Sequence, residues 1–151
     1  MISLLSAVVS IFLLMVGCKE APRQSVAIDS RTISSRSERI TAAMRYLQTD
    51  FEMRIQDADY IEEQIGDGFV GPSDFVLYMR LQLDPESISR WKRHLEKLKG
   101  THDWSPKTKV EWWALEGGNM EWYQSAGLIV GRHSAIAFDN GNLAYVVLNT
   151  M

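Results

Sequence analysis

The 151-residue chain contains a single cysteine, so it can form neither an internal disulfide nor a zinc site built from several cysteines. That residue, Cys18, stands near the N-terminus at the end of an apolar run. If Cys18 carries another group, no thiol remains for nucleophilic catalysis. Stability then has to come from packing, and the five tryptophans indicate an aromatic-rich core.

The chain also lacks an excess of positive charge. It has 16 Lys and Arg residues against 19 Asp and Glu residues, a formal net charge of −3. No stripe of Lys and Arg stands out after the first 50 residues, whereas a nucleic-acid-binding protein usually carries a basic patch or stripe. We therefore expect no nucleic-acid partner.

Motifs for nucleophilic catalysis, zinc binding and phosphate binding are missing from the sequence. No G-x-S-x-G elbow, G-x-x-x-x-G-K-[ST] loop or G-x-G-x-x-G loop occurs. The spacing of His94, His102 and His133 matches no H-x-x-x-H or H-E-x-x-H zinc pattern. We expect no metal and no cofactor, and we interpret the histidines as surface or structural residues.

The acidic residues give no recognisable motif either. Asp57 and Asp59 begin like a calcium loop, but Ile61 and Glu62 stand where a further oxygen ligand and a glycine are required. Glu62 and Glu63 are typical of a solvated face. A small periplasmic hydrolase remains an alternative if distant residues converge in one pocket. The residues that would have to converge are His102, His133, Asp57, Asp59 and Glu62.

An apolar segment without charged side chains occupies residues 1–17, MISLLSAVVSIFLLMVG. It is shorter than the roughly 20 residues that a membrane-spanning helix needs, and Lys19 and Glu20 end it abruptly. The apolar core of a secretory signal peptide is about 7–15 residues long and is followed by small residues. We expect a signal peptide at 1–17. The alternatives are an uncleaved membrane anchor and a buried helix with an incidental cysteine.

The residues Leu14-Met15-Val16-Gly17-Cys18 resemble the lipobox of bacterial lipoproteins. The resemblance covers only about the first tenth of the chain, and Met15 stands where leucine is usual. It implies that the Cys18 thiol takes a diacylglycerol, that the signal peptide is cleaved, and that the new amino group is acylated. It also implies a lipid-anchored protein on the periplasmic or extracytoplasmic side of a bacterial membrane. By the same resemblance, Lys19 after the cysteine mildly favours the outer membrane over the inner membrane, where the organism has an outer membrane.

Three parts follow from this organisation. After the signal peptide at 1–17, residues 18–35 form the lipidated cysteine and a flexible tether, because they are polar and without periodicity. Residues 36–151 are long enough for one domain and too short for two. The order of predicted elements indicates an α+β fold with an antiparallel sheet of about four to five strands, packed with one or two helices.

The first half of this domain contains three predicted elements. Ser35-x-x-Glu38 is a capping-box pattern that predicts a helix over about 36–48. The region 50–65 fits both an alternating strand and a continued helical stripe, and we favour the extended form. FVLYMRLQL predicts a strand at 75–83, and turn residues occur at 66–68 and 71–72.

A second helix is predicted at 85–99. Asp84 is a good N-cap, Pro85 suits the first helical position, and a stripe of apolar residues ends before Gly100. Residues 110–115 read as a short strand or an irregular aromatic segment, and a strand begins near Met120. The last two strands, 129–138 and 143–148, flank an Asn-Gly hairpin turn.

The tryptophans in the C-terminal half admit two interpretations. Neighbouring residues of a strand point to opposite faces, so Trp112 and Trp113 cannot both face the core if their segment is a strand. One interpretation is that a neighbouring loop buries both rings. The other is a surface for a protein partner, formed by Trp112, Trp113 and Trp122, since aromatic residues are enriched at interface hot spots.

The sequence favours a non-enzymatic, membrane-anchored domain that binds another macromolecule of the cell envelope. The membrane itself is a partner through the lipid on Cys18. A lipoprotein that gives immunity against a secreted toxin is an alternative within the binding class. The small periplasmic hydrolase is the enzymatic alternative.

Overall fold

The computed structural model describes residues 29–47, 52–65, 74–100, 102, 104–113, 120–124, 133–139 and 141–149. The expected signal peptide and Cys18 lie outside these residues, as do the turn residues at 66–68 and 71–72. The described elements are, in chain order, η1 (Ser30–Thr32), α1 (Arg36–Tyr46), β1 (Ile55–Ile65), β2 (Asp74–Leu83), α2 (Pro85–Lys92), β3 (Glu96–Lys97), β4 (Trp122–Gln124), β5 (His133–Phe138) and β6 (Leu143–Asn149).

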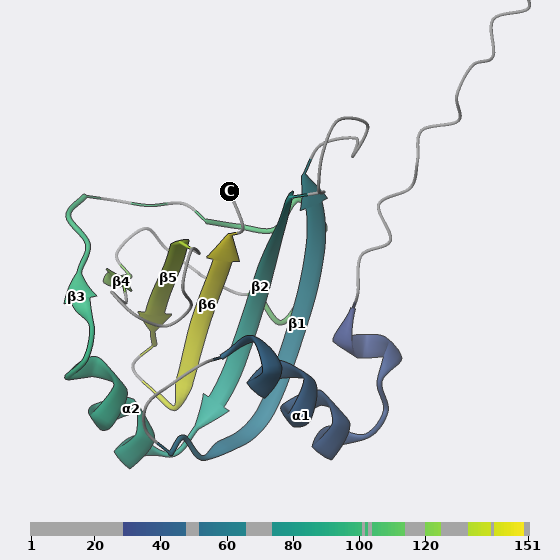
Figure 1. The fold of residues 1–151 in the computed structure, drawn as a ribbon, viewed down its shortest axis with the longest axis horizontal. Helices are drawn as coiled ribbons and strands as arrows, with labels where there is room; N and C mark the ends of the chain where they lie inside the picture. Colours follow the sequence, from purple (N-terminus) through teal and green to yellow (C-terminus); the bar gives the residue numbers. More distant parts are fainter. Residues whose placement is uncertain are drawn as a thin grey trace, which may run out of the picture.

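The six described strands form one open sheet with the order β1-β2-β6-β5-β4-β3 (Figure 1), and every neighbouring pair is antiparallel. The predicted α+β class is confirmed, with two α-helices. The predicted number of four to five strands is too low. The additional strand, β3, has only two residues, which pair with Tyr123 and Gln124 of β4, and so short a segment has no alternating pattern to reveal it.

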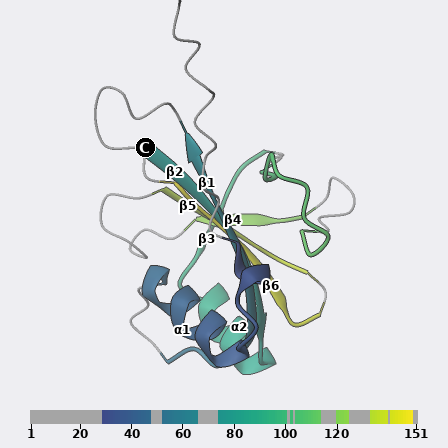
Figure 2. The same ribbon diagram turned by 90° about the vertical axis from the view of Figure 1, so that its right-hand side faces the viewer.

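Different parts of the chain cover the two faces of the sheet (Figure 2). α1 and α2 lie against one face, which we call the helix face, and the irregular segment after β3 lies on the other, which we call the loop face. The core on the helix side consists of Ala43, Leu47, Met53, Ala58, Tyr60, Leu77, Met79, Leu81, Leu83, Ile88, Trp91, Ile136, Phe138, Ala144, Val146 and Leu148. The core on the loop side consists of Ile61, Val76, Tyr78, Val110, Trp112, Trp113, Trp122, Ala135, Ala137, Tyr145 and Val147.

α1 begins at the capping residue that the sequence predicts. The Ser35 hydroxyl accepts a hydrogen bond from the Glu38 N–H at 3.4 Å, which satisfies one free donor of the first turn. The helix ends at Tyr46, within two residues of the predicted end, and its fully buried Ala43 lets it approach the sheet closely.

The extended interpretation of the region after residue 50 is confirmed by β1. This strand pairs with β2 from Ile55 to Ile65, with a bulge between Ile55 and Asp57. Its side chains alternate, so that Ala58 and Tyr60 are buried on the helix face and Ile61 is buried on the loop face. The strand predicted at 75–83 is confirmed by β2.

The second helix is shorter than predicted, because α2 ends at Lys92 rather than near residue 99. Its N-terminus is as expected, since the Asp84 carboxylate accepts the Ser87 N–H at 3.0 Å. The apolar stripe that suggested a longer helix is divided between the two sides of the sheet: Leu95 packs with the helix-side core and Leu98 with the loop-side core. The chain leaves the helix to form β3, so pairing with β4 overrides the local helical pattern.

The last two described strands form the predicted hairpin. The carboxylate of Asp139 accepts hydrogen bonds from the N–H groups of Gly141 at 2.9 Å and Leu143 at 3.0 Å. The Asp139 N–H in turn donates to the Leu143 carbonyl at 3.1 Å. An Asp side chain that bonds the backbone two residues on is a typical turn device.

Residues 29–35, which the sequence places in the tether, belong to the folded domain. Asp29 forms a bridge to Ile61 of β1. Ser30 is fully buried, and its hydroxyl accepts the Tyr60 N–H at 2.9 Å. The composition of the segment hides this docking, since hydroxyl and backbone groups make the contacts.

Among the described residues, no helix has the length and apolar character needed to cross a membrane.

Candidate functional site

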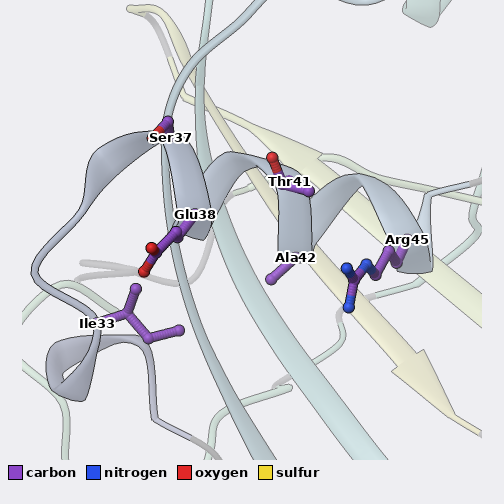
Figure 3. Close-up of a pocket in the computed structure, with 6 residues that line it drawn as sticks. All are labelled: Ile33, Ser37, Glu38, Thr41, Ala42 and Arg45. Carbon is purple, nitrogen blue, oxygen red and sulfur yellow. The ribbon is translucent and has the colours of Figure 1, made fainter.

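A shallow groove runs along one side of α1 and has a volume of about 320 Å³ (Figure 3). One of its lining residues comes from the turn before α1 and the other five come from the helix. The lining residues are Ile33, Ser37, Glu38, Thr41, Ala42 and Arg45.

The groove combines an apolar wall with two opposite charges. Ile33 and Ala42 are partly buried, while Glu38 and Arg45 are exposed and stand seven residues apart, about 10 Å along the helix axis. No ion-pair partner of Glu38 or Arg45 is found among the described residues. Met44, next to the groove, is 40% exposed. The groove therefore offers an apolar wall between an acidic and a basic side chain.

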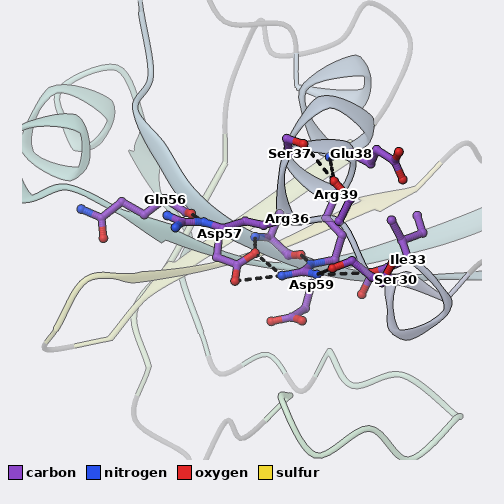
Figure 4. A network of polar contacts seen from close by, with 12 residues as sticks. Ser30, Ile33, Arg36, Ser37, Glu38, Arg39, Gln56, Asp57 and Asp59 are labelled. Atoms are coloured by element: carbon purple, nitrogen blue, oxygen red, sulfur yellow. Dashed lines mark hydrogen bonds and ion pairs between the residues drawn. The ribbon is translucent and has the colours of Figure 1, made fainter.

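Polar side chains cover the outer edge of β1 (Figure 4). The Arg36 guanidinium donates to the Gln56 carbonyl, and the Arg39 guanidinium donates to the Ala58 carbonyl at 3.2 Å. An open strand edge is a template for pairing with another chain. These two arginines, with the docked Ser30, therefore occupy backbone groups that a foreign strand could otherwise use.

The same guanidinium of Arg39 neutralises Asp57. Its Nη2 lies 2.7 Å and 3.0 Å from the two carboxylate oxygens. Burial raises the pKa of Asp57, but the hydrogen bonds from Arg39 and the Ala58 N–H, with the charges of Arg39 and Arg36, outweigh burial and hold the pKa below its ordinary value of 3.8. Asp57 is therefore ionised at neutral pH and serves in a structural ion pair.

Asp59 is also paired with an arginine. It lies directly opposite Arg80 in the register of β1 and β2, and the Arg80 Nε is 3.0 Å from its carboxylate. Neither Asp57, Asp59 nor Glu62 lines the groove on α1. In the described ranges, no group of three His, Cys, Asp or Glu side chains is arranged to hold a metal ion.

The loop face is covered by Trp104–Trp113, a segment without helix or strand that we call the strap. Trp113 makes edge-to-face contacts with Tyr78 of β2 and Tyr145 of β6, each at 5.3 Å between ring centroids. Trp104 makes a similar contact with Trp122 of β4 at 4.9 Å. The strap is thus fixed to the sheet by aromatic contacts at both of its ends.

Glu63 holds the middle of the strap. Its side chain projects from β1 into the loop-side core and is 9% exposed. The carboxylate accepts the backbone N–H of Lys107 at 3.0 Å and that of Thr108 at 2.7 Å. Burial and then the nearby charge of Glu63 raise the pKa of Tyr78 above its ordinary value of 10.0. The expectation that Glu63 lies on a solvated face is therefore wrong.

The structure places all three tryptophans of the candidate partner surface in the core. Trp112, Trp113 and Trp122 are 7%, 9% and 4% exposed. Both rings are buried, as one of the two interpretations expects, but they belong to the strap itself and pack in the loop-side core rather than lying beneath a neighbouring loop. Little indole surface remains for a partner in this conformation.

The histidines lie apart from one another along the chain. His94 is exposed in the turn after α2. The His102 ring stacks on Trp104 with centroids 4.6 Å apart, and its Nε2 is 3.1 Å from the Lys99 carbonyl. His133 is the first residue of β5.

No family model, curated protein or solved structure matches this chain. The interpretation of function therefore depends on the residues and their geometry.

Two features of the structure, the buried position of Glu63 and the pair Arg36 and Arg39, do have signals in the sequence. Ile61 and Ile65 flank Glu63 at strand spacing, so alternation alone would place Glu63 on a buried face. Arg36 and Arg39 are three residues apart, which puts them on the same side of a helix. The groove has no comparable signal, because it forms where Ile33 meets α1.

Proposed function

We propose that this chain is a non-enzymatic binding domain held at a bacterial membrane by lipid on Cys18. The observation that carries the proposal is the Leu14–Cys18 motif, which ends an uncharged apolar segment with the only thiol of the chain. One acyl chain binds a bilayer only marginally, whereas two or more anchoring signals hold a protein stably. A diacylated and N-acylated Cys18 would satisfy that requirement, and by the resemblance to lipoproteins Lys19 mildly favours the outer membrane over the inner membrane.

The groove on α1 supports the binding part of the proposal. Its exposed charges, Glu38 and Arg45, are unpaired among the described residues, and Met44 adds apolar surface beside them. The partner that fits is a protein of the cell envelope that offers a basic group to Glu38 and an acidic group to Arg45. The paired carboxylates of Asp57 and Asp59 support a structural rather than a catalytic role for those acids.

The anchor is tested by Cys18→Ser in cells fed labelled palmitate. We expect the variant to lose the label and to leave the membrane fraction, while the unchanged chain keeps both. Ser6→Ala is the matched control, since it alters the apolar segment without touching the motif. Continued labelling or unchanged membrane association of Cys18→Ser would contradict the anchor.

The binding surface is tested with a photo-crosslinking residue in the tethered chain. At Thr41, inside the groove, we expect a discrete adduct with an envelope protein. Ser89 on α2 is an exposed control position outside the groove. The absence of an adduct at Thr41, or equal adducts at both positions, would contradict the groove as the contact surface while leaving the anchor untouched.

A further inference from the structure

We propose that the strap opens as one unit while the sheet stays folded, and that Glu63 is the latch that keeps it closed. In the closed state the strap covers an aromatic surface on the loop face. In the open state that surface is uncovered. This inference does not depend on the membrane anchor or on the groove.

The latch is a single buried carboxylate that bonds the backbone of the strap. Glu63 reaches across from β1 and receives the N–H groups of two successive residues, Lys107 and Thr108. The side chains of Lys107, Thr108 and Lys109 are exposed. The described contact that ties this middle part to the sheet is therefore the one with Glu63.

Two unpaired donors oppose closure. The indole N–H groups of Trp112 and Trp113 are buried and have no hydrogen-bond acceptor among the described residues. A buried donor without a partner is unfavourable, because the group has lost its hydrogen bond to water. Opening would allow water to accept hydrogen bonds from both indole N–H groups. The strap is thus held by Glu63, by aromatic packing and by the buried Val110, against the cost of the two unpaired donors, which poises it to open.

The sheet beneath can stay intact when the strap leaves. The strap contributes no strand to the sheet. The central strands β2 and β6 pair with each other over residues Val76 to Gln82 of β2. The helix-side core on the other face contains no strap residue. Opening therefore removes the cover of Tyr78, Tyr145 and Trp122 without breaking strand pairing.

Hydrogen exchange of the full-length chain in detergent micelles tests whether the strap is a unit. We expect the backbone amides of Lys107 and Thr108 and the indole N–H groups of Trp112 and Trp113 to exchange at a common, faster opening frequency than the amides of β6. If these four groups exchanged only when the whole domain unfolds, at the same opening frequency as the β6 amides, the proposal would be overturned. This measurement uses the unaltered chain, so it stands whether or not a variant folds.

Glu63→Gln tests the latch. The amide keeps the size of the side chain, but its NH₂ group cannot accept from a backbone N–H. Hydrogen bonds to a charged group are strong enough that we expect roughly 10- to 100-fold faster exchange of the Lys107 and Thr108 amides. Trypsin should also cut faster after Lys107 and Lys109, with cleavage sites located by mass spectrometry.

Glu62→Gln is the matched control, because Glu62 is the neighbouring acid on β1 and does not bond the strap. We expect unchanged exchange and cleavage in this variant. Equal effects of the two substitutions, or no effect of Glu63→Gln on the strap amides, would overturn the role of Glu63 as the latch.

Discussion

Asp57 and Glu63 lie six residues apart on β1, and their carboxylates are stabilised in different ways. Asp57 faces a guanidinium, that of Arg39, at the partly exposed edge of the sheet. Glu63 receives two backbone N–H groups in the loop-side core. The contact of Asp57 balances charge, whereas the contact of Glu63 fixes the position of the strap. Replacement of Asp57 should therefore change the pH dependence of stability, and replacement of Glu63 should change the opening of the strap.

Asp57 should make the domain sensitive to acid. Its pKa is lowered in the folded state, so the unfolded state binds more protons between the two pKa values, and its stabilising contribution is complete above about pH 4 to 5. That contribution is lost as the pH falls through the lower, folded-state pKa. We expect Asp57→Asn to reduce the decrease in stability between pH 6 and pH 3, measured by urea unfolding with tryptophan fluorescence.

Glu52→Gln is the control for this measurement, because it removes an exposed carboxylate from the loop before β1. Its acid dependence should equal that of the unchanged chain. An Asp57→Asn variant with the full acid dependence would show that its pairing with Arg39 contributes nothing to stability.

Trp91 should be the side chain of α2 that matters most for stability. It is 1% exposed and packs in a T-shaped arrangement with Phe138, with the ring centroids 5.7 Å apart. Removal of a large aromatic side chain from a core costs about 3–5 kcal/mol, because a cavity remains. We expect Trp91→Ala to lower the free energy of unfolding by that amount and Trp91→Phe to lower it by less. A loss below about 1 kcal/mol in denaturant titrations would contradict this anchoring role.

At the scale of elements, the edge of β1 is the feature that most needs explanation. An 11-residue edge strand would be open to pairing along its length. The chain covers it with Ser30, Arg36 and Arg39 rather than with another strand. The cover comes from the segment just before β1 in sequence, so it is local and forms without a long loop.

Arg39→Met should therefore cause association as well as loss of stability. It removes the bonds to the Ala58 carbonyl and to Asp57, and the loss of these charge-assisted hydrogen bonds should cost about 1–3 kcal/mol. The uncovered edge should give concentration-dependent dimers in sedimentation velocity. Arg45→Met is the matched control on the same helix, because Arg45 has no ion pair among the described residues, and it should stay monomeric. Equal behaviour of the two variants would contradict an edge-covering role for Arg39.

Elements with strong local signals were predicted well. Ser35 and Asp84 mark the starts of α1 and α2, the apolar run of β2 marks a strand, and the turn after Asp139 marks the hairpin. Each of these signals acts within a few residues, so the sequence displays it directly.

Features that depend on distant contacts were predicted poorly. α2 ends early because Glu96 and Lys97 pair with β4, which begins 25 residues further along the chain. The latch joins Glu63 to a segment more than 40 residues away. The groove needs Ile33 to lie against α1. The spacing of residues within a segment does not indicate contacts with residues far away in the chain.

At the scale of the whole molecule, the domain begins earlier than its composition suggests. A chain that starts at Ile28 keeps the docked residues Asp29 and Ser30, as does a chain that starts at Lys19. A chain that starts at Ile33 lacks Ser30 and its bond to the Tyr60 N–H, so its free energy of unfolding should be lower by about 1–2 kcal/mol. Urea unfolding of the three chains checks this boundary. Equal stability of all three would show that the docked segment is dispensable.

The docking of η1 also decides how the domain would respond to tension. If the proposed lipid tether is pulled, mechanical load enters at Asp29, at the margin of the sheet. The bridge to Ile61 and the hydrogen bond that the Tyr60 N–H donates to Ser30 would be loaded one after the other, as in a zipper, before any force reached α1. The central strands β2 and β6 would bear no load until those outer attachments had broken. Movement of the membrane relative to the domain would therefore detach η1 first and leave the central strands paired.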